Sequence, residues 1–389
     1  MNDFIYSSPT KILFGKSNHN KLGSELKQLG ASKVLVCYGQ NHVKKSGLLD
    51  SVVQQLNDLK ISTFEYGGIS ANPSKAHALK GIEFAKAHAV DFIVAIGGGS
   101  VIDEAKCIAA GVVNDKIWDF YTGKQYKLDG ALPIAAVLTI PAAGSEASAF
   151  TVIREDESGR KYAMGSRHLI PKLAYINPEY CFTLPKNQIA NGVSDILAHL
   201  LERYFSPQNH VIVTDKLLTA AIQSVFELAP KVYANNTHYA YWSELCKLGT
   251  LAHNGMLDMG RDLQDWATHR IENSFLSGVH NIAHGEGLAI LFLAWLKFMS
   301  NKRPEKLVQF AVEVMQVEGN SDKEKIDLAI IKLEKFYKSL NLPVRLSDIK
   351  LRACEIEKLV DDVYTEDMIL GDYAQLCAND IKAIIRLAE

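Results

Sequence analysis

Short apolar runs alternate with helical stretches in the first half of the chain. The runs at 33–38, 91–96 and 133–140 are continuously apolar and bounded by turn residues, as expected for strands buried on both faces. Between them, the spacing of apolar positions predicts helices. These are residues 48–59, 75–88 and 101–112. Such alternation predicts an α/β layer structure around a mostly parallel sheet.

The pattern changes near Thr183-Leu-Pro185, after which helical periodicity continues almost to the end of the chain. The predicted helices are 187–205, 211–229, 239–254, 266–277, 287–299, 305–317, 322–340, 353–363 and 379–387. We therefore predict two domains: an α/β domain over residues 1–185 and an all-α domain over residues 186–389.

Composition and charge narrow the class of protein. The chain has 389 residues, of which 48% are hydrophobic, a fraction typical of globular proteins. Its net charge of −2 gives no surplus of basic residues for binding nucleic acid or an anionic membrane. The most apolar run, 288–296, is too short to span a bilayer. Six scattered cysteines without a C-x-x-C pair, and a start without the features of a signal peptide, favour a cytoplasmic protein with reduced thiols.

Asp195 and His199 are the first candidates for chemistry. Their i, i+4 spacing puts both side chains on one face of a predicted helix. An Asp within an apolar helix is costly to bury unless it is paired or binds a metal. The alternative for His199 is an ordinary core histidine, but the pairing favours a divalent cation site.

A second stretch, some seventy residues further on, supplies more imidazoles. His269 and His284 offer the remaining ligands, and a set of one carboxylate and three imidazoles suits Fe(II) or Zn(II) better than Mg(II) or Ca(II). His280 lies four residues before His284, so it competes as a ligand if this stretch is helical. We rank it as a residue that lines the site.

Three turns after predicted strands are candidates for nucleotide binding. Gly97, Gly98, Gly99 and Ser100 open a helix, whose N-terminus favours an anion such as a pyrophosphate; the alternative is an ordinary strand-to-helix turn. A small-residue loop begins at Thr139 and allows close approach of a ligand.

The third turn contains Gly39, Gln40 and Asn41, where a doubly wound sheet would meet adenosine ribose. No Asp or Glu lies between Cys37 and Gly47 to hold a ribose 2′-hydroxyl, whereas Lys44 and Lys45 are near. This favours a 2′-phosphate, and hence NADP(H) over NAD(H), although solvent-facing lysines are the alternative.

Several motifs in order resemble the iron-containing (group III) alcohol dehydrogenase family over essentially the whole chain. They are residues 9–15, 97–103 with Lys106, 139–146, 177–180, 183–185, 190–199, 265–269 and 283–290. In detail they resemble the NADPH-dependent butanol dehydrogenase and broad-range aldehyde reductase branch more than glycerol dehydrogenase.

The resemblance implies a Rossmann-like domain followed by a helical domain, a fold shared with dehydroquinate synthase, with the active site in the cleft between them. It implies that the metal ligands are Asp195, His199, His269 and His284. It also implies that residues 97–100 bind the cofactor pyrophosphate. Asp103 falls near the nicotinamide end, while Thr139 and Lys161 fall near the cofactor.

Two departures from the family pattern concern the second histidine stretch. Asn273 stands where relatives commonly have a second histidine, which is a candidate for proton relay, and His280 is the candidate to replace it. The interval from His269 to His284 is fifteen residues where fourteen is usual, which places one extra residue around 274–278. Altered proton delivery or metal affinity is therefore expected.

The predicted activity is reversible hydride transfer between NADP(H) and a small alcohol or aldehyde, with the metal as Lewis acid. A homodimer is expected because relatives are often dimers. One alternative is a lyase resembling dehydroquinate synthase, although no convincing basic cluster for a substrate phosphate is visible in the helical domain. The other is a non-catalytic relative that binds metal or nucleotide, motivated by Asn273.

Overall fold

The computed structural model describes residues 2–208, 211–280, 282–349, 351, 353–362 and 369–389. The chain divides into two compact units. One unit comprises Ser7–Thr183 with Asn236–Asn254, and the other comprises the residues up to Tyr6, Leu184–Asn235 and Gly255–Glu389. The segment 236–254 thus belongs to the first unit, although it lies in the helical half of the sequence.

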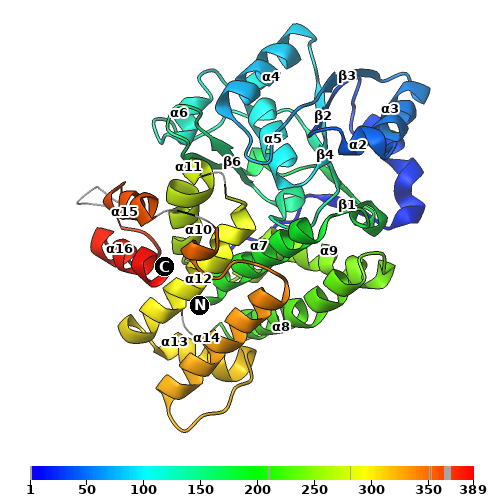
Figure 1. The fold of residues 1–389 in the computed structure, drawn as a ribbon. Helices are drawn as coiled ribbons and strands as arrows, with labels where there is room; N and C mark the ends of the chain where they lie inside the picture. Colours follow the sequence, from blue (N-terminus) through cyan, green and yellow to red (C-terminus); the bar gives the residue numbers. More distant parts are fainter. Residues whose placement is uncertain (1, 209–210, 281, 350, 352, 363–368) are drawn as a thin grey trace. The chain divides into compact units, whose positions relative to one another are not determined.

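A six-stranded parallel sheet forms the centre of the first unit (Figure 1), with strand order β1-β8-β5-β4-β2-β3. Its strands are β1 (Lys11–Phe14), β2 (Lys33–Tyr38), β3 (Ser62–Tyr66), β4 (Phe92–Gly97), β5 (Ile134–Leu138) and β8 (Leu173–Ile176). The three apolar runs became β2, β4 and β5, which confirms the parallel sheet. The strands β1, β3 and β8 were not predicted from the sequence, although β8 is a short apolar run.

Helices cover both faces of this sheet. Alternate side chains of β2, β4 and β5 pack with α1 (Leu22–Gln28) and α3 (Leu48–Asp58) in one apolar core. On the other face α5 (Gly99–Val113) packs against β4, with α4 (Lys75–Ala87) beside it (Figure 1).

The rest of the first unit is smaller. It contains the short helices α2 (His42–Lys45) and α6 (Trp118–Tyr121), the helix α9 (Tyr239–His253) and the antiparallel pair β6 (Phe150–Arg154) and β7 (Lys161–Gly165). The antiparallel pair was not expected from the sequence, because its buried positions lie among exposed and half-buried ones, without the continuous apolar pattern of the central strands.

The second unit is helical, which confirms the second part of the predicted fold. Its centre is the pair α7 (Lys186–Tyr204) and α12 (His284–Lys302), which pack side by side. Around them lie α8 (Ile212–Ala234), α10 (Ala267–Ile271), α11 (Ser277–His280), α13 (Glu305–Gln309), α14 (Asp322–Ser339), α15 (Ala353–Asp362) and α16 (Ala378–Leu387). Within the described part of the chain, no helix combines the length and apolar character needed to cross a membrane.

Candidate metal and dinucleotide sites

A polar stripe runs along one face of α7. Asp195, His199 and Glu202 follow an i, i+4, i+7 spacing and are all buried. The Nδ1–H of His199 donates to the backbone carbonyl of Asp195 at 2.8 Å, and the same nitrogen lies 3.0 Å from Asp195 Oδ1. Because Nδ1 is engaged within the helix, Nε2 is the candidate nitrogen for a metal.

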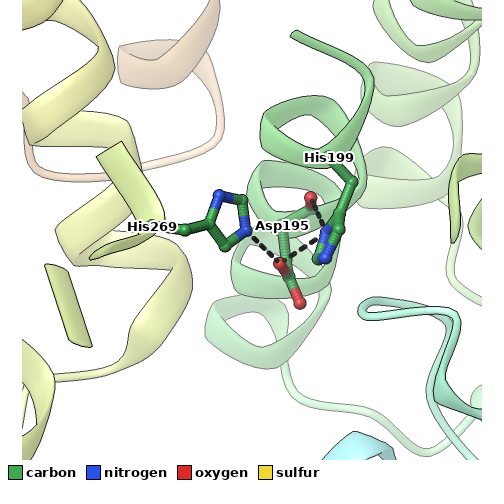
Figure 2. Close-up of side chains that lie close together, drawn as sticks. All are labelled: Asp195, His199 and His269. Carbon is green, nitrogen blue, oxygen red and sulfur yellow. Dashed lines mark hydrogen bonds and ion pairs between the residues drawn. The ribbon is translucent and has the colours of Figure 1, made fainter. Parts of the chain in front are cut away.

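Two further imidazoles come to the same carboxylate from other elements. His269 lies in α10 and His284 is the first residue of α12, and the Nε2 atom of each is 3.8 Å from Asp195 Oδ1. Ligand atoms of Asp195, His199 and His269 all lie within 4.8 Å of one another. Figure 2 shows the two histidines flanking the aspartate from opposite sides. The structure therefore brings all four predicted metal ligands together.

The position of His284 depends on a close approach between α7 and the start of α12. A Cβ atom on Gly285 would lie 2.4 Å from the backbone oxygen of Asn191 in α7, so only glycine permits this packing. The Ser194 hydroxyl then donates to the Gly285 carbonyl at 2.7 Å. These contacts fix the start of α12 against the helix that carries Asp195.

Buried carboxylates accept hydrogen bonds from the Nδ1 atoms of His269 and His284. Glu202 accepts from His269 Nδ1 at 3.0 Å, from the His269 backbone N–H at 3.1 Å and from the Thr268 hydroxyl. Glu272 accepts from His284 Nδ1 and, at 2.9 Å, from the Ser277 hydroxyl. A carboxylate on Nδ1 selects the tautomer whose Nε2 is free to bind a metal, and it makes the imidazole more basic.

Neither of these glutamates was predicted from the sequence, although each shares a helical face with a candidate ligand. Glu202 lies three residues after His199 and Glu272 lies three residues after His269, so each shares a helical face with a candidate ligand. Glu202 also directly follows the apolar pair Leu200 and Leu201, so the argument that had identified Asp195 applied to it as well.

The electrostatics of the group favour a cation. Burial opposes ionisation of Asp195, but its contacts with His199, His269 and His284 outweigh this effect and hold its pKa well below the ordinary value. Burial lowers the pKa of His199. Burial acts in the same direction on His269, but Asp195 and Glu202 together raise the pKa of His269 to about 9.

The residues fit a divalent metal. Asp195 Oδ1 and His269 Nε2 are buried, and neither has a hydrogen-bond partner of ordinary geometry among the described residues. One carboxylate and three imidazoles, with carboxylates behind two of them, form a donor set that suits Fe(II) or Zn(II).

The helix type changes locally in the stretch where the sequence predicts an extra residue between His269 and His284. Residues Glu272–Leu276 form a π-helical turn between α10 and α11. A π turn closes each hydrogen bond over one more residue than an α turn, so it absorbs an insertion without breaking the helix. Asn273 lies in this turn and is half-buried. His280 is the last residue of α11, and its assigned role stays a prediction.

The glycine turn after β4 has the geometry of a phosphate cradle. β4 ends at Gly97, Gly98 is the N-cap and α5 begins at Gly99. A Cβ on Gly98 would lie 2.3 Å from Ile140 Cγ2, so a side chain here would have no room. The bare backbone and the N-terminus of a fifteen-residue helix together suit a pyrophosphate.

Four of the other predicted cofactor residues directly follow strands of the same sheet. Gly39, Gln40 and Asn41 follow β2 and line a pocket of about 270 Å³. The backbone N–H of Thr139 donates to the Gly97 carbonyl at 3.1 Å. Lys161 begins β7 and is half-buried.

Asp103 makes contacts within its own unit. Its Oδ1 accepts from the Ser145 hydroxyl at 2.6 Å and its Oδ2 accepts from the Val152 backbone N–H at 2.9 Å. The buried Lys106 ammonium also donates to Ser145, at 2.8 Å. These hydrogen bonds connect α5 to the segment after β5, which contains Ser145, and to β6. The catalytic roles assigned to Asp103 and Lys161 stay predictions.

Comparison with known proteins gives consistent matches over the full chain. The family described as iron-containing alcohol dehydrogenase matches residues 9–178, and its C-terminal counterpart matches residues 189–388. A probable NADH-dependent butanol dehydrogenase of Bacillus subtilis is 37% identical, with 99% of each chain covered. The NADPH-dependent aldehyde reductase YqhD of Escherichia coli is 34% identical, with 92% of each covered. The crystal structure of a Thermotoga maritima NADH-dependent butanol dehydrogenase A superposes with a TM-score of 0.95 at 36% identity, covering 100% of this chain and 99% of that one.

Proposed function

Because the chain belongs to the iron-containing alcohol dehydrogenase family, we propose that it transfers a hydride between a nicotinamide dinucleotide and a small alcohol or aldehyde at a divalent metal. The observation that supports the proposal is that nitrogen atoms of His199, His269 and His284 all lie within 3.8 Å of one carboxylate oxygen of Asp195. The names of full-length relatives, a butanol dehydrogenase and an aldehyde reductase, support the substrate class.

The metal-binding side chains are proposed to be these four, with Fe(II) or Zn(II) as the cation. When bound, such a cation polarises a carbonyl or lowers the pKa of an alcohol. Asp195 supplies the single negative charge among the ligands. Glu202 and Glu272 keep the rings of His269 and His284 in one orientation and one tautomer.

The dinucleotide is proposed to bind the sheet unit. The turn 97–100 would hold the pyrophosphate, and Gly39, Gln40 and Asn41 would surround the adenosine ribose. Thr139, Asp103 and Lys161 are the proposed residues toward the nicotinamide. Hydride transfer needs the protein to orient both reactants and to exclude water, so the dinucleotide and metal sites act together.

The preference for NADP(H) over NAD(H) stays a prediction. This preference is based on Lys44 and Lys45. Of the relatives named above, one is described as NADH-dependent and another as NADPH-dependent. A homodimer in the cytoplasm also remains part of the proposal, and light scattering coupled to gel filtration tests the dimer.

A substrate panel tests the function directly. Metal-loaded protein, prepared separately with Fe(II) and Zn(II), is mixed with butanal and either NADPH or NADH, and absorbance of the reduced nicotinamide is followed. We expect consumption of at least one cofactor that depends on the aldehyde. Absence of turnover with every short aldehyde in protein shown to contain metal would contradict the proposal. Substrate-dependent phosphate release would instead favour a lyase resembling dehydroquinate synthase.

A further inference from the structure

A charged pair lies where two neighbouring parallel strands end. β2 and β3 pair in parallel with Val36 opposite Glu65, so the residues after both strands meet at one edge of the sheet. Tyr38, Gly39, Gln40, Asn41, Lys44, Gly67 and Gly68 line the pocket there. Lys44 is the one charged side chain in this lining, whereas Lys45 is not part of it.

Glu65 contacts two side chains of the pocket. The Tyr38 hydroxyl donates to Glu65 Oε2 at 3.0 Å, and Lys44 Nζ lies 3.6 Å from the same oxygen. The ammonium also lies 5.0 Å from the centre of the Tyr38 ring. Tyr38, Lys44 and Glu65 therefore form one cluster in which the carboxylate compensates the lysine charge.

This cluster changes the argument for cofactor preference. The sequence between 37 and 47 offers lysines and no acid, but β3 brings a carboxylate to Lys44 from outside that segment. A 2′-phosphate carries between one and two negative charges near neutral pH, about 1.5 to 2 by analogy with phosphorylated side chains. Beside Glu65 it would meet a carboxylate and an already paired ammonium. A neutral 2′-hydroxyl meets no such repulsion and can donate to a carboxylate.

We propose that Glu65 is a specificity-determining residue, which disfavours a 2′-phosphate at this pocket and so favours NAD(H) over NADP(H). The proposal rests on the proposed function, because it takes the pocket as the adenosine ribose site. It runs against the preference that the lysines alone predicted.

The test is the ratio of kcat/KM for NADPH to kcat/KM for NADH in the metal-loaded enzyme. Glu65→Gln removes the charge and keeps the shape, and the pair is half-exposed, with 46% of the Glu65 side chain and 49% of the Lys44 side chain accessible, so folding is not at risk. We expect the ratio to rise about fivefold, the upper range for one exposed charge interaction.

A matched control removes a carboxylate from a similar pair elsewhere. Glu227 pairs with Lys231 at 2.6 Å on α8, in the helical unit, and Glu227→Gln changes the net charge equally. We expect the control to leave the ratio unchanged. An unchanged ratio in an active Glu65→Gln enzyme, or an equal rise in both variants, overturns the role of Glu65 and leaves the proposed function standing.

Binding measurements separate this inference from the proposed function. Adenosine 2′,5′-bisphosphate and 5′-AMP are titrated calorimetrically into wild type and Glu65→Gln, without a need for turnover. A gain of about fivefold for the bisphosphate alone supports Glu65 even if no aldehyde is reduced. Failure of both nucleotides to bind the wild type overturns the inference, because the pocket would then not be an adenosine site.

Discussion

The four candidate metal ligands come from two segments of the chain, which we call the first and second walls, and the two walls differ in how regular their backbone is. The first wall is α7, an uninterrupted helix of nineteen residues that carries Asp195 and His199. The second wall, described except for residue 281, passes through α10, a π turn and α11 before α12 begins with His284. The regular helix fixes its ligands by their spacing and by a hydrogen bond within the helix, whereas the histidines of the irregular wall are held by Glu202 and Glu272.

Removing the charge of the first wall gives the largest expected effect. Asp195→Asn takes away the anionic ligand that three imidazoles face. A Lewis acid contributes several kcal/mol to the transition state, so kcat/KM should fall by about a thousandfold or more. Metal content after dialysis, measured by plasma mass spectrometry, and aldehyde reduction check this. Asp322→Asn, at an exposed position in α14, is the control; normal metal content and activity in Asp195→Asn would contradict the assignment.

The carboxylates behind the second wall should come next. Glu202→Gln and Glu272→Gln each remove the acceptor on a histidine Nδ1, which should weaken metal binding by about 10- to 100-fold. The larger loss is expected for Glu202, because it accepts three hydrogen bonds and holds the more buried histidine. Competition with a chromophoric chelator measures the affinity, and absorption of bound Co(II) reports on the ligand geometry. If both variants fold, as judged by circular dichroism, and bind metal as tightly as the wild type, the histidines of the second wall do not depend on these glutamates.

The difference between the walls also explains what the sequence revealed. The parallel sheet and most helices were predictable because apolar runs and helical spacing are local signals. Asp195 and His199 were predictable for the same reason. The shared oxygen with His269 and His284 required tertiary packing at Gly285, which no local pattern encodes.

Two features of the sites were hidden for other physical reasons. The π turn at Glu272–Leu276 lies where the sequence predicts an extra residue, but a π turn depends on hydrogen bonding that composition does not specify. The carboxylate beside Lys44 comes from β3, an edge strand of exposed and half-buried residues without a continuous apolar run. A search limited to the segment after β2 therefore missed it.

Metal removal should affect the two walls unequally. In α7 the ligands sit on a continuous helix packed against α8 and α12, whereas α10 and α11 are short. We expect chelation to raise amide hydrogen exchange about tenfold or more in 267–280, since a ligand present at 100 times its Kd stabilises by about 2.7 kcal/mol. Exchange in 193–201 should change little. Equal deprotection of both segments would show that the irregular wall is no more dependent on metal than α7.

The smallest expected effect concerns Asn273, at the π turn of the second wall. Asn273→His introduces a group with an ordinary pKa of about 6.5 where the present side chain does not titrate. Below that pH the added imidazolium can donate a proton during aldehyde reduction, and above it this contribution is lost. The ratio of variant to wild-type kcat should therefore decline as pH rises through about 6.5, by an amount we expect to be near threefold. Asn273→Ala controls for loss of the amide and should show no such pH dependence. A flat ratio for Asn273→His would mean that the wall does not pass protons at this position, and that its departure from regular helix geometry serves ligand placement alone.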